Sequence, residues 1–177
     1  LLKEILPSCT KEETYSLEPG GQLEWASPPH ANLQDLAKAF QVHQDRLDKL
    51  SQKKGLRALH LGIDPIHEPQ EIDLIHQTKY QLMDRHLQKV GTLGRWMMRN
   101  SSSIQMNFDI VDEKDAEEIL FVSDALQPVA AHLFANSPFW KGECAGDRNL
   151  RYEIWEETDS KRCRNLIDQG MTQQNNL

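Results

Sequence analysis

Two glutamates and a glutamine stand at even spacings around a Pro-Gly-Gly bend: Glu18, Gln22 and Glu24. Residues two apart along a strand share a face, so we expect these polar side chains opposite Leu17 and Leu23. A fully extended strand holds Glu18 and Glu24 about 20 Å apart, at about 3.3 Å per residue, which is too far for one cation. Either the bend shortens this gap, or each carboxylate serves a different cation. The alternative is a hairpin bend with two solvated glutamates.

A second polar group alternates with apolar residues further along the chain. Neutral amides dominate it, whereas the solvent faces of ordinary strands favour Thr, Lys and Glu. Amides that line a cavity suit phosphate, amino or carboxylate groups, and an exposed strand face is the alternative. The polar residues are Ser103, Gln105, Asn107 and Asp109, and the apolar ones are Ile104, Met106, Phe108 and Ile110.

One arginine is a candidate for binding a substrate carboxylate. Arg151 stands four residues before Trp155, and a guanidinium fork can grip a carboxylate by two parallel hydrogen bonds. The commoner role of an arginine is a surface ion pair, here with Glu153 or Asp159.

Several well-known kinds of site are absent from the sequence. It contains no P-loop, no Gly-x-Gly-x-x-Gly turn and no Gly-x-Ser-x-Gly elbow, and its histidines lack metal-ligand spacing. The three cysteines, Cys9, Cys144 and Cys163, are widely spaced, which favours a reducing, cytoplasmic location. No apolar run approaches the roughly 20 residues of a membrane span, so we expect no membrane association.

The charge balance is acidic, with 27 Asp and Glu against 20 Lys and Arg. Because the basic residues are scattered, the sequence argues against a nucleic-acid partner. An acidic protein can still hold ATP where divalent cations lie between its carboxylates and the phosphates.

The elements that must position these residues follow from hydrophobic periodicity and from turn residues. Strands and helices alternate irregularly, which predicts an α+β domain with a one-sided, mainly antiparallel sheet. We expect a single domain over residues 1–177. The predicted strands are 15–27 with a bend, 56–63, 101–110 and 151–155. The predicted helices are 33–50 with caps at Asn32 and Gly55, 72–91, and 113–136 with a kink at Pro128; residues 169–177 should be loose.

Five stretches together resemble the glutamate-cysteine ligase family of plants and many bacteria. Their order and spacing match from about residue 15 to residue 163, with residues 164–177 as a polar tail. The stretches are residues 16–24 (SLEPGGQLE), 89–94 (KVGTLG), 103–109 (SIQMNFD), 125–139 (ALQPVA through FANSPF), and 151–155 (RYEIW) with Thr158, Asp159 and Arg162.

The resemblance implies a glutamine-synthetase-like fold, of which this chain would be the central part. In that fold a curved antiparallel sheet, with helices on its outer face, carries ATP, Mg²⁺ and glutamate on its concave face. ATP phosphorylates the γ-carboxylate of L-glutamate, and the amine of L-cysteine attacks the acyl phosphate, the first step of glutathione synthesis. Catalysis then consists mostly of positioning and of charge neutralisation, and the resemblance assigns no catalytic residue.

Residue by residue, the resemblance gives each candidate a role. Lys79 stands where the family has a second carboxylate-binding arginine, and a lysine cannot reproduce a bidentate fork. The acceptor is therefore L-cysteine or another small amine. Glu18 and Glu24 would hold Mg²⁺, Gln105 and Asn107 would line the ATP and glutamate cavity, Ser103 and Met106 would line the amino-acid pocket, and Arg151 would bind the carboxylate of cysteine.

Glu18, Glu24, Gln105, Asn107 and Arg151 should thus converge on one hollow of the sheet. The family's first acidic strand is expected before residue 1 and its later strands beyond residue 163, and the family has Gly where this chain has Arg164. We therefore expect the isolated chain to bind metal poorly and to catalyse nothing. The complete protein should be a monomer or homodimer, and a non-catalytic binding module with the same fold is the alternative to an enzyme.

Overall fold

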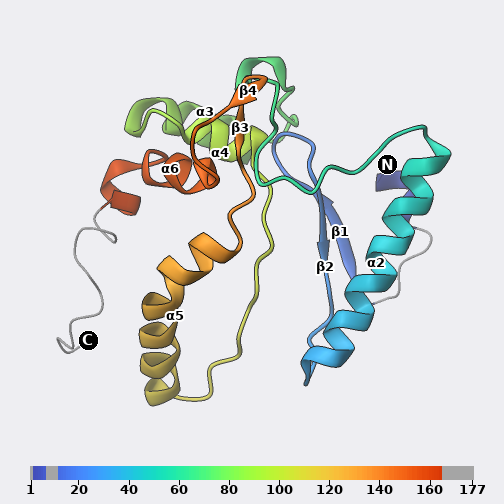
Figure 1. Ribbon diagram of the computed structural model, residues 1–177, viewed down its shortest axis with the longest axis vertical. Helices are drawn as coiled ribbons and strands as arrows, with labels where there is room; N and C mark the ends of the chain where they lie inside the picture. The colour runs from blue at the N-terminus through green and yellow to red at the C-terminus, as the bar shows by residue number, and fades with distance from the viewer. Residues whose placement is uncertain (1, 7–11, 165–177) are drawn as a thin grey trace. The chain divides into compact units, whose positions relative to one another are not determined.

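The computed structural model describes residues 2–6 and 12–164, and its chain divides into two compact units, residues 1–60 and 61–177. Both contain helices and antiparallel strands, which confirms the α+β class (Figure 1). None of the helices in the described ranges is both long and apolar enough to cross a lipid bilayer. Cys9 and the tail from residue 165 onward lie outside the described residues. Each unit is described below by itself.

The first unit is a β-hairpin with a long helix. It consists of α1 (Leu2–Ile5), β1 (Thr14–Leu17), β2 (Leu23–Ala26) and α2 (Leu33–Lys53). The strands pair antiparallel, with Ser16 opposite Glu24 and Leu17 opposite Leu23. Gly21 closes the turn at a φ of +85°, a backbone conformation that costs glycine little. The predicted strand with a tight bend is confirmed.

The predicted caps of α2 are confirmed as well. Asn32 accepts a hydrogen bond from the Asp35 backbone N–H at 2.9 Å, which satisfies one of the donors left unpaired at a helix start. At the other end Gly55 adopts a φ of +65°, the left-handed conformation typical of the residue that follows a helix.

A polar and aromatic cluster joins the hairpin to α2. Tyr15 on β1 shares a 2.8 Å hydrogen bond with His43, and Arg46 donates to the same Tyr15 hydroxyl at 3.1 Å. The Trp25 indole stacks on the His43 ring with centroids 4.6 Å apart and donates to Glu13. The hairpin therefore has a defined orientation relative to the helix.

In its described part, residues 61–164, the second unit has four helices longer than one turn and a small hairpin. Each of its two apolar clusters includes a residue of α4: one consists of Ile63, Trp96, Leu150 and Ile154, and the other of Tyr80, Leu87 and Met98. The elements are a 3-10 turn at Pro69–Glu71, α3 (Thr78–Val90), α4 (Gly94–Asn100), α5 (Glu113–Leu133), β3 (Phe139–Trp140), β4 (Glu143–Cys144), α6 (Leu150–Glu156) and a π-helical turn at Ser160–Arg164.

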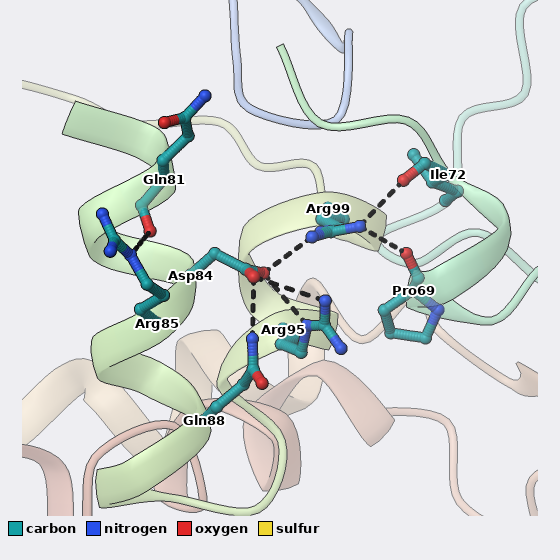
Figure 2. A network of polar contacts seen from close by, with 8 residues as sticks. All are labelled: Pro69, Ile72, Gln81, Asp84, Arg85, Gln88, Arg95 and Arg99. Carbon is teal, nitrogen blue, oxygen red and sulfur yellow. Dashed lines mark hydrogen bonds and ion pairs between the residues drawn. The ribbon is translucent and has the colours of Figure 1, made fainter. Parts of the chain in front are cut away.

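A buried carboxylate ties α3 to α4 and to the loop before α3. Asp84 accepts hydrogen bonds from Arg99 at 2.8 Å and from Arg95 at 3.0 and 3.3 Å, as Figure 2 shows. Arg99 also donates to the carbonyl oxygens of Pro69 and Ile72, both at 3.0 Å. Burial alone raises the pKa of Asp84, but the hydrogen bonds and charges of the two arginines outweigh it and hold this pKa below its ordinary value.

Two glycines let the α3–α4 turn approach the end of α6. A Cβ added at Gly91 would collide with the carbonyl oxygens of Glu157 and Thr158, which are backbone atoms that cannot move aside alone. At Gly94 a Cβ would lie 2.8 Å from the Leu87 Cβ. The Thr92 and Leu93 N–H groups both donate to the Glu157 carbonyl oxygen, so the contact is also hydrogen-bonded.

The predicted strand at 101–110 is wrong. Beyond a single bridge between Ser101 and Ile63, the described residues offer this segment no partner strand. A strand is stable only when its N–H and C=O groups pair with a neighbour. The segment instead runs as an extended connection from α4 to α5 (Figure 1), with Ile104 83% and Met106 55% exposed.

Two further predicted strands are also wrong. Residues 56–63 are an irregular connection with Leu56 and Leu59 exposed, because only Ile63 finds a bridge partner and a buried place in the described structure. Residues 151–155 lie inside α6, where Leu150 and Ile154 are buried four residues apart on one helix face.

The two remaining predicted helices are confirmed with altered bounds. The first of them, α3, begins at Thr78 instead of residue 72. The chain before it forms a loop whose carbonyl oxygens accept hydrogen bonds from Arg99. It ends at Gly91 as predicted. Helix α5 contains Pro128, as predicted, and changes direction along its length in Figure 1.

We expect D84N to lower the free energy of unfolding at pH 7 by about 3–5 kcal/mol, because it leaves two arginines without their carboxylate. A folded-state pKa below the unfolded value gives stability that is present above the unfolded pKa and lost as pH falls through the folded one. The difference in the free energy of unfolding between wild type and D84N, measured by urea unfolding, should therefore become smaller below about pH 4. D73N, at an exposed aspartate, is the matched control; an equal loss there would contradict the role of Asp84.

We expect G91A to destabilise the protein by about 1–3 kcal/mol or more, because overpacking against backbone atoms forces the α3–α4 turn away from α6. Thermal unfolding measures the loss. G55A places a Cβ in open space at a positive φ and should cost only about 1 kcal/mol. A G91A protein as stable as wild type would show that the close contact is not required.

Candidate functional site

The hairpin brings its two candidate metal ligands onto one face. Glu24 lies opposite Ser16, and the Glu18 N–H donates to the Gln22 carbonyl oxygen at 2.9 Å. Glu18 and Glu24 are therefore diagonal neighbours on adjacent strands, a relation that puts residues about 7–8 Å apart. The Pro-Gly-Gly bend shortens the gap, as one of the two sequence interpretations required. Ser16 donates to the Glu24 carboxylate at 2.9 Å.

The chemistry of this donor set fits Mg²⁺ in part. Magnesium is commonly held by one or two protein carboxylates, with water and substrate phosphates as the other ligands. Glu18 and Glu24 offer such a pair on a half-exposed surface. Within residues 2–6 and 12–164, no group of three or more His, Cys, Asp or Glu side chains forms a ready-made metal cage.

The candidate cavity residues of the 103–109 segment are exposed. Gln105 donates from its amide to the Ser103 hydroxyl at 3.3 Å, so these two side chains lie together. Asn107 and Met106 lie on the same connection, also exposed. Their assignment to an ATP and glutamate cavity or to an amino-acid pocket stays a prediction.

Arg151 is positioned by the start of α6. Its backbone N–H donates to the Ser137 hydroxyl at 2.9 Å, and Ser137 is itself buried and bonded to the Arg148 carbonyl oxygen at 2.9 Å. The side chain passes Gly62, where an added Cβ would lie 3.3 Å from the Arg151 Cδ. Its guanidinium carbon then lies over the Trp155 ring, 5.7 Å from the centroid.

The guanidinium of Arg151 is partly desolvated and forms no ion pair within residues 2–6 and 12–164. Burial lowers the pKa of Arg151, and its buried Nε has no hydrogen-bond partner in the described part of the chain. Asp159, one of the two predicted ion-pair partners, instead accepts from the Arg162 Nε at 2.7 Å. Across the described ranges Arg151 forms no ion pair with Glu153 either. A half-buried cation in this state is suited to binding an external anion.

Lys79 lies at the start of α3 with its side chain exposed. Its ammonium group sits over the ring of the neighbouring Tyr80, 4.5 Å from the centroid. A lysine in this place offers a point charge and not a planar fork, so it cannot hold a carboxylate by two parallel bonds.

Sequence reasoning missed two of the residues that shape the surroundings of Arg151. Gly62 lies in a segment that was predicted to be a strand, and no pattern marked it as a close-approach position. Ser137 carried a weak signal, because a Ser-Pro pair after a helix favours a turn in which the hydroxyl bonds nearby backbone.

The candidate residues fall in both units. Glu18 and Glu24 belong to the first unit, and Lys79, Ser103, Gln105, Met106, Asn107 and Arg151 belong to the second. Their convergence on a single hollow therefore stays a prediction. Each unit by itself supplies one defined feature. The first has a carboxylate pair on a hairpin, and the second has a guanidinium on a helix without an ion-pair partner among the described residues.

Comparison with known proteins identifies relatives along nearly the whole chain. The family model of glutamate-cysteine ligase family 2 (GCS2) matches residues 1–174. The chloroplastic glutamate–cysteine ligase of Medicago truncatula is 34% identical over 151 residues, which cover 85% of this chain and 30% of that protein.

Two more relatives show the same relation. The chloroplastic glutamate–cysteine ligase of Arabidopsis thaliana is 34% identical over 85% of this chain and 29% of its own length. Glutamate–cysteine ligase A of Oryza sativa subsp. indica, also named chloroplastic, is 33% identical over 85% of this chain and 31% of its own length. The chain thus spans about a third of the length of these curated relatives. It belongs to glutamate-cysteine ligase family 2.

Proposed function

We propose that the complete protein joins the amine of L-cysteine to the γ-carboxylate of L-glutamate at the expense of ATP, using Mg²⁺. Membership of the glutamate-cysteine ligase family carries this proposal. The relatives' names support the reaction, and the Arg151 guanidinium, which has no ion-pair partner in the described part of the chain, supports an amine acceptor that bears a carboxylate. A cytoplasmic location stays a prediction, whereas the plant relatives are named chloroplastic.

The reaction proceeds in two displacements. A γ-carboxylate oxygen of glutamate attacks the terminal phosphorus of ATP, and ADP leaves. The cysteine amine then attacks the resulting acyl phosphate carbon, phosphate leaves with the bonding electrons, and the nitrogen loses a proton. Neither displacement requires a covalent bond to the protein, so its contribution lies in positioning and electrostatics.

The residues of this chain would divide that work. Glu18 and Glu24 hold the cation, which when bound neutralises phosphate charge. Gln105 and Asn107 line the ATP and glutamate cavity, and Ser103 and Met106 the amino-acid pocket. Arg151 grips the acceptor carboxylate by paired hydrogen bonds. We also propose that the β1–β2 hairpin is part of the curved sheet of a glutamine-synthetase-like fold, which its antiparallel pairing and single polar face support.

A related γ-glutamyl ligase with another small amine as acceptor is the second candidate. The observation that favours it is Lys79, which offers one point charge where the family has a second arginine fork. Such an enzyme would use the same acyl phosphate and differ only in the attacking amine.

The reaction is tested with the full-length protein and four components: ATP, Mg²⁺, L-glutamate and L-cysteine. We expect phosphate release only when all four are present, because the acyl phosphate is consumed by the amine. Turnover independent of cysteine would count against the ligase. A panel of other amino acids in the same assay separates the two candidates, since the second predicts a higher kcat/KM for another amine.

We expect R151K in the full-length enzyme to raise the KM for cysteine about 10- to 100-fold while changing the KM for glutamate little. The substitution keeps the charge but loses one charge-assisted hydrogen bond, worth about 1.5–3 kcal/mol. R148K, the same exchange at an exposed arginine three residues earlier, is the matched control. Equal changes in both KM values would show that Arg151 does not bind the acceptor.

A further inference from the structure

The side chain of Arg151 has two close neighbours, Gly62 along its stem and Trp155 at its guanidinium. The first neighbour is Gly62. Its N–H donates to the Asn136 carbonyl oxygen at 2.7 Å, and its carbonyl oxygen accepts from the Ser102 N–H at 3.0 Å. Because both backbone groups of Gly62 are hydrogen-bonded, the backbone at this position does not shift easily. A Cβ there would press on the Arg151 stem, so the absence of a side chain leaves room for the arginine.

The second neighbour is the indole ring of Trp155, one helical turn further along α6. Residues four apart lie on the same helix face, which brings the ring under the guanidinium. The neighbouring Ile154 is fully buried in the core with Leu150, so the helix that carries both Arg151 and Trp155 is anchored. The Trp155 side chain itself is 40% exposed, so packing in the core does not account for its place on this helix.

An aromatic face and a hydrogen-bonding edge use different parts of a guanidinium. Stacking engages the flat face of the group, and a carboxylate binds in its plane through the N–H donors. The cation–π contact with Trp155 is thus compatible with in-plane N–H donors of Arg151 that stay open to an anion. It also limits the rotamers of a side chain that no carboxylate of the described residues holds.

Given the proposed ligase function, we propose that Trp155 is a positioning residue: it stacks under Arg151 and fixes its guanidinium for the carboxylate of the amine acceptor. Gly62, which has no side chain, leaves room for the stem of the same arginine. Holding the group in its bound geometry reduces the entropy lost on binding, so Trp155 sets affinity for the acceptor and not for glutamate.

The experiment uses full-length protein with W155L, W155F and, as a matched aromatic-to-leucine control, F139L, whose side chain is 41% exposed. We expect W155L to raise the KM for cysteine about 3- to 30-fold, the range of a cation–π contact, with the KM for glutamate within about 2-fold of wild type. W155F keeps an aromatic face and should recover most of the loss. F139L should behave as wild type in both KM values.

A double-mutant cycle with R151M separates positioning from simple stabilisation. R151M removes the guanidinium, so W155L should add less than about 2-fold to the cysteine KM in that background. Equal rises in both KM values, a W155F enzyme as impaired as W155L, or multiplicative effects in the cycle would each overturn this role. A wild type without cysteine-dependent phosphate release overturns the ligase proposal itself and this role with it; a normal wild type with an unaltered W155L enzyme overturns this role alone.

Discussion

The second unit depends on one buried carboxylate that forms ion pairs with two arginines. Asp84 is nearly inaccessible and accepts from both Arg95 and Arg99, while Arg99 continues to two carbonyl oxygens of the loop before α3. A buried charge without its partner is strongly unfavourable, so the three segments can move apart only together with the loss of this network. Helix α4 is thereby fixed, and Trp96 on α4 packs with Leu150 and Ile154 of α6. That chain of contacts anchors α6, the helix that carries Arg151.

Two of the stretches that resemble the ligase family have structural roles that sequence alone did not reveal. In residues 89–94 the glycines provide space, because Gly91 and Gly94 leave room for the backbone at Thr158. In the last stretch, Thr158 donates to the Ile154 carbonyl oxygen at the end of α6, and Asp159 accepts from Arg162 in the turn that follows. These residues therefore support the helix that carries Arg151 without having to touch a substrate.

The sequence predicted those elements whose signals are local. The β1–β2 hairpin follows from its Pro-Gly-Gly turn, and α2 from a long apolar periodicity with a cap at each end. The strand at 101–110 failed because alternation describes a surface and not the partner that must cover it. Helix α6 was missed because Tyr152, Ile154 and Trp155 all favour strands, whereas the buried four-residue spacing of Leu150 and Ile154 is helical.

The candidate site divides in the same way between what residue types indicate and what only coordinates supply. Arg151 was a candidate from its chemistry and from a family resemblance, but the sequence also offered Glu153 and Asp159 as ordinary partners. Arg99 shows what an arginine of this core looks like when its role is structural, since Asp84 and two backbone carbonyl oxygens surround it. Arg151 has an aromatic ring and a glycine in their place. Within the described residues Arg99 has a carboxylate and two backbone carbonyl oxygens as partners, whereas Arg151 has none of these, so Arg151 is the arginine suited to an anion from outside.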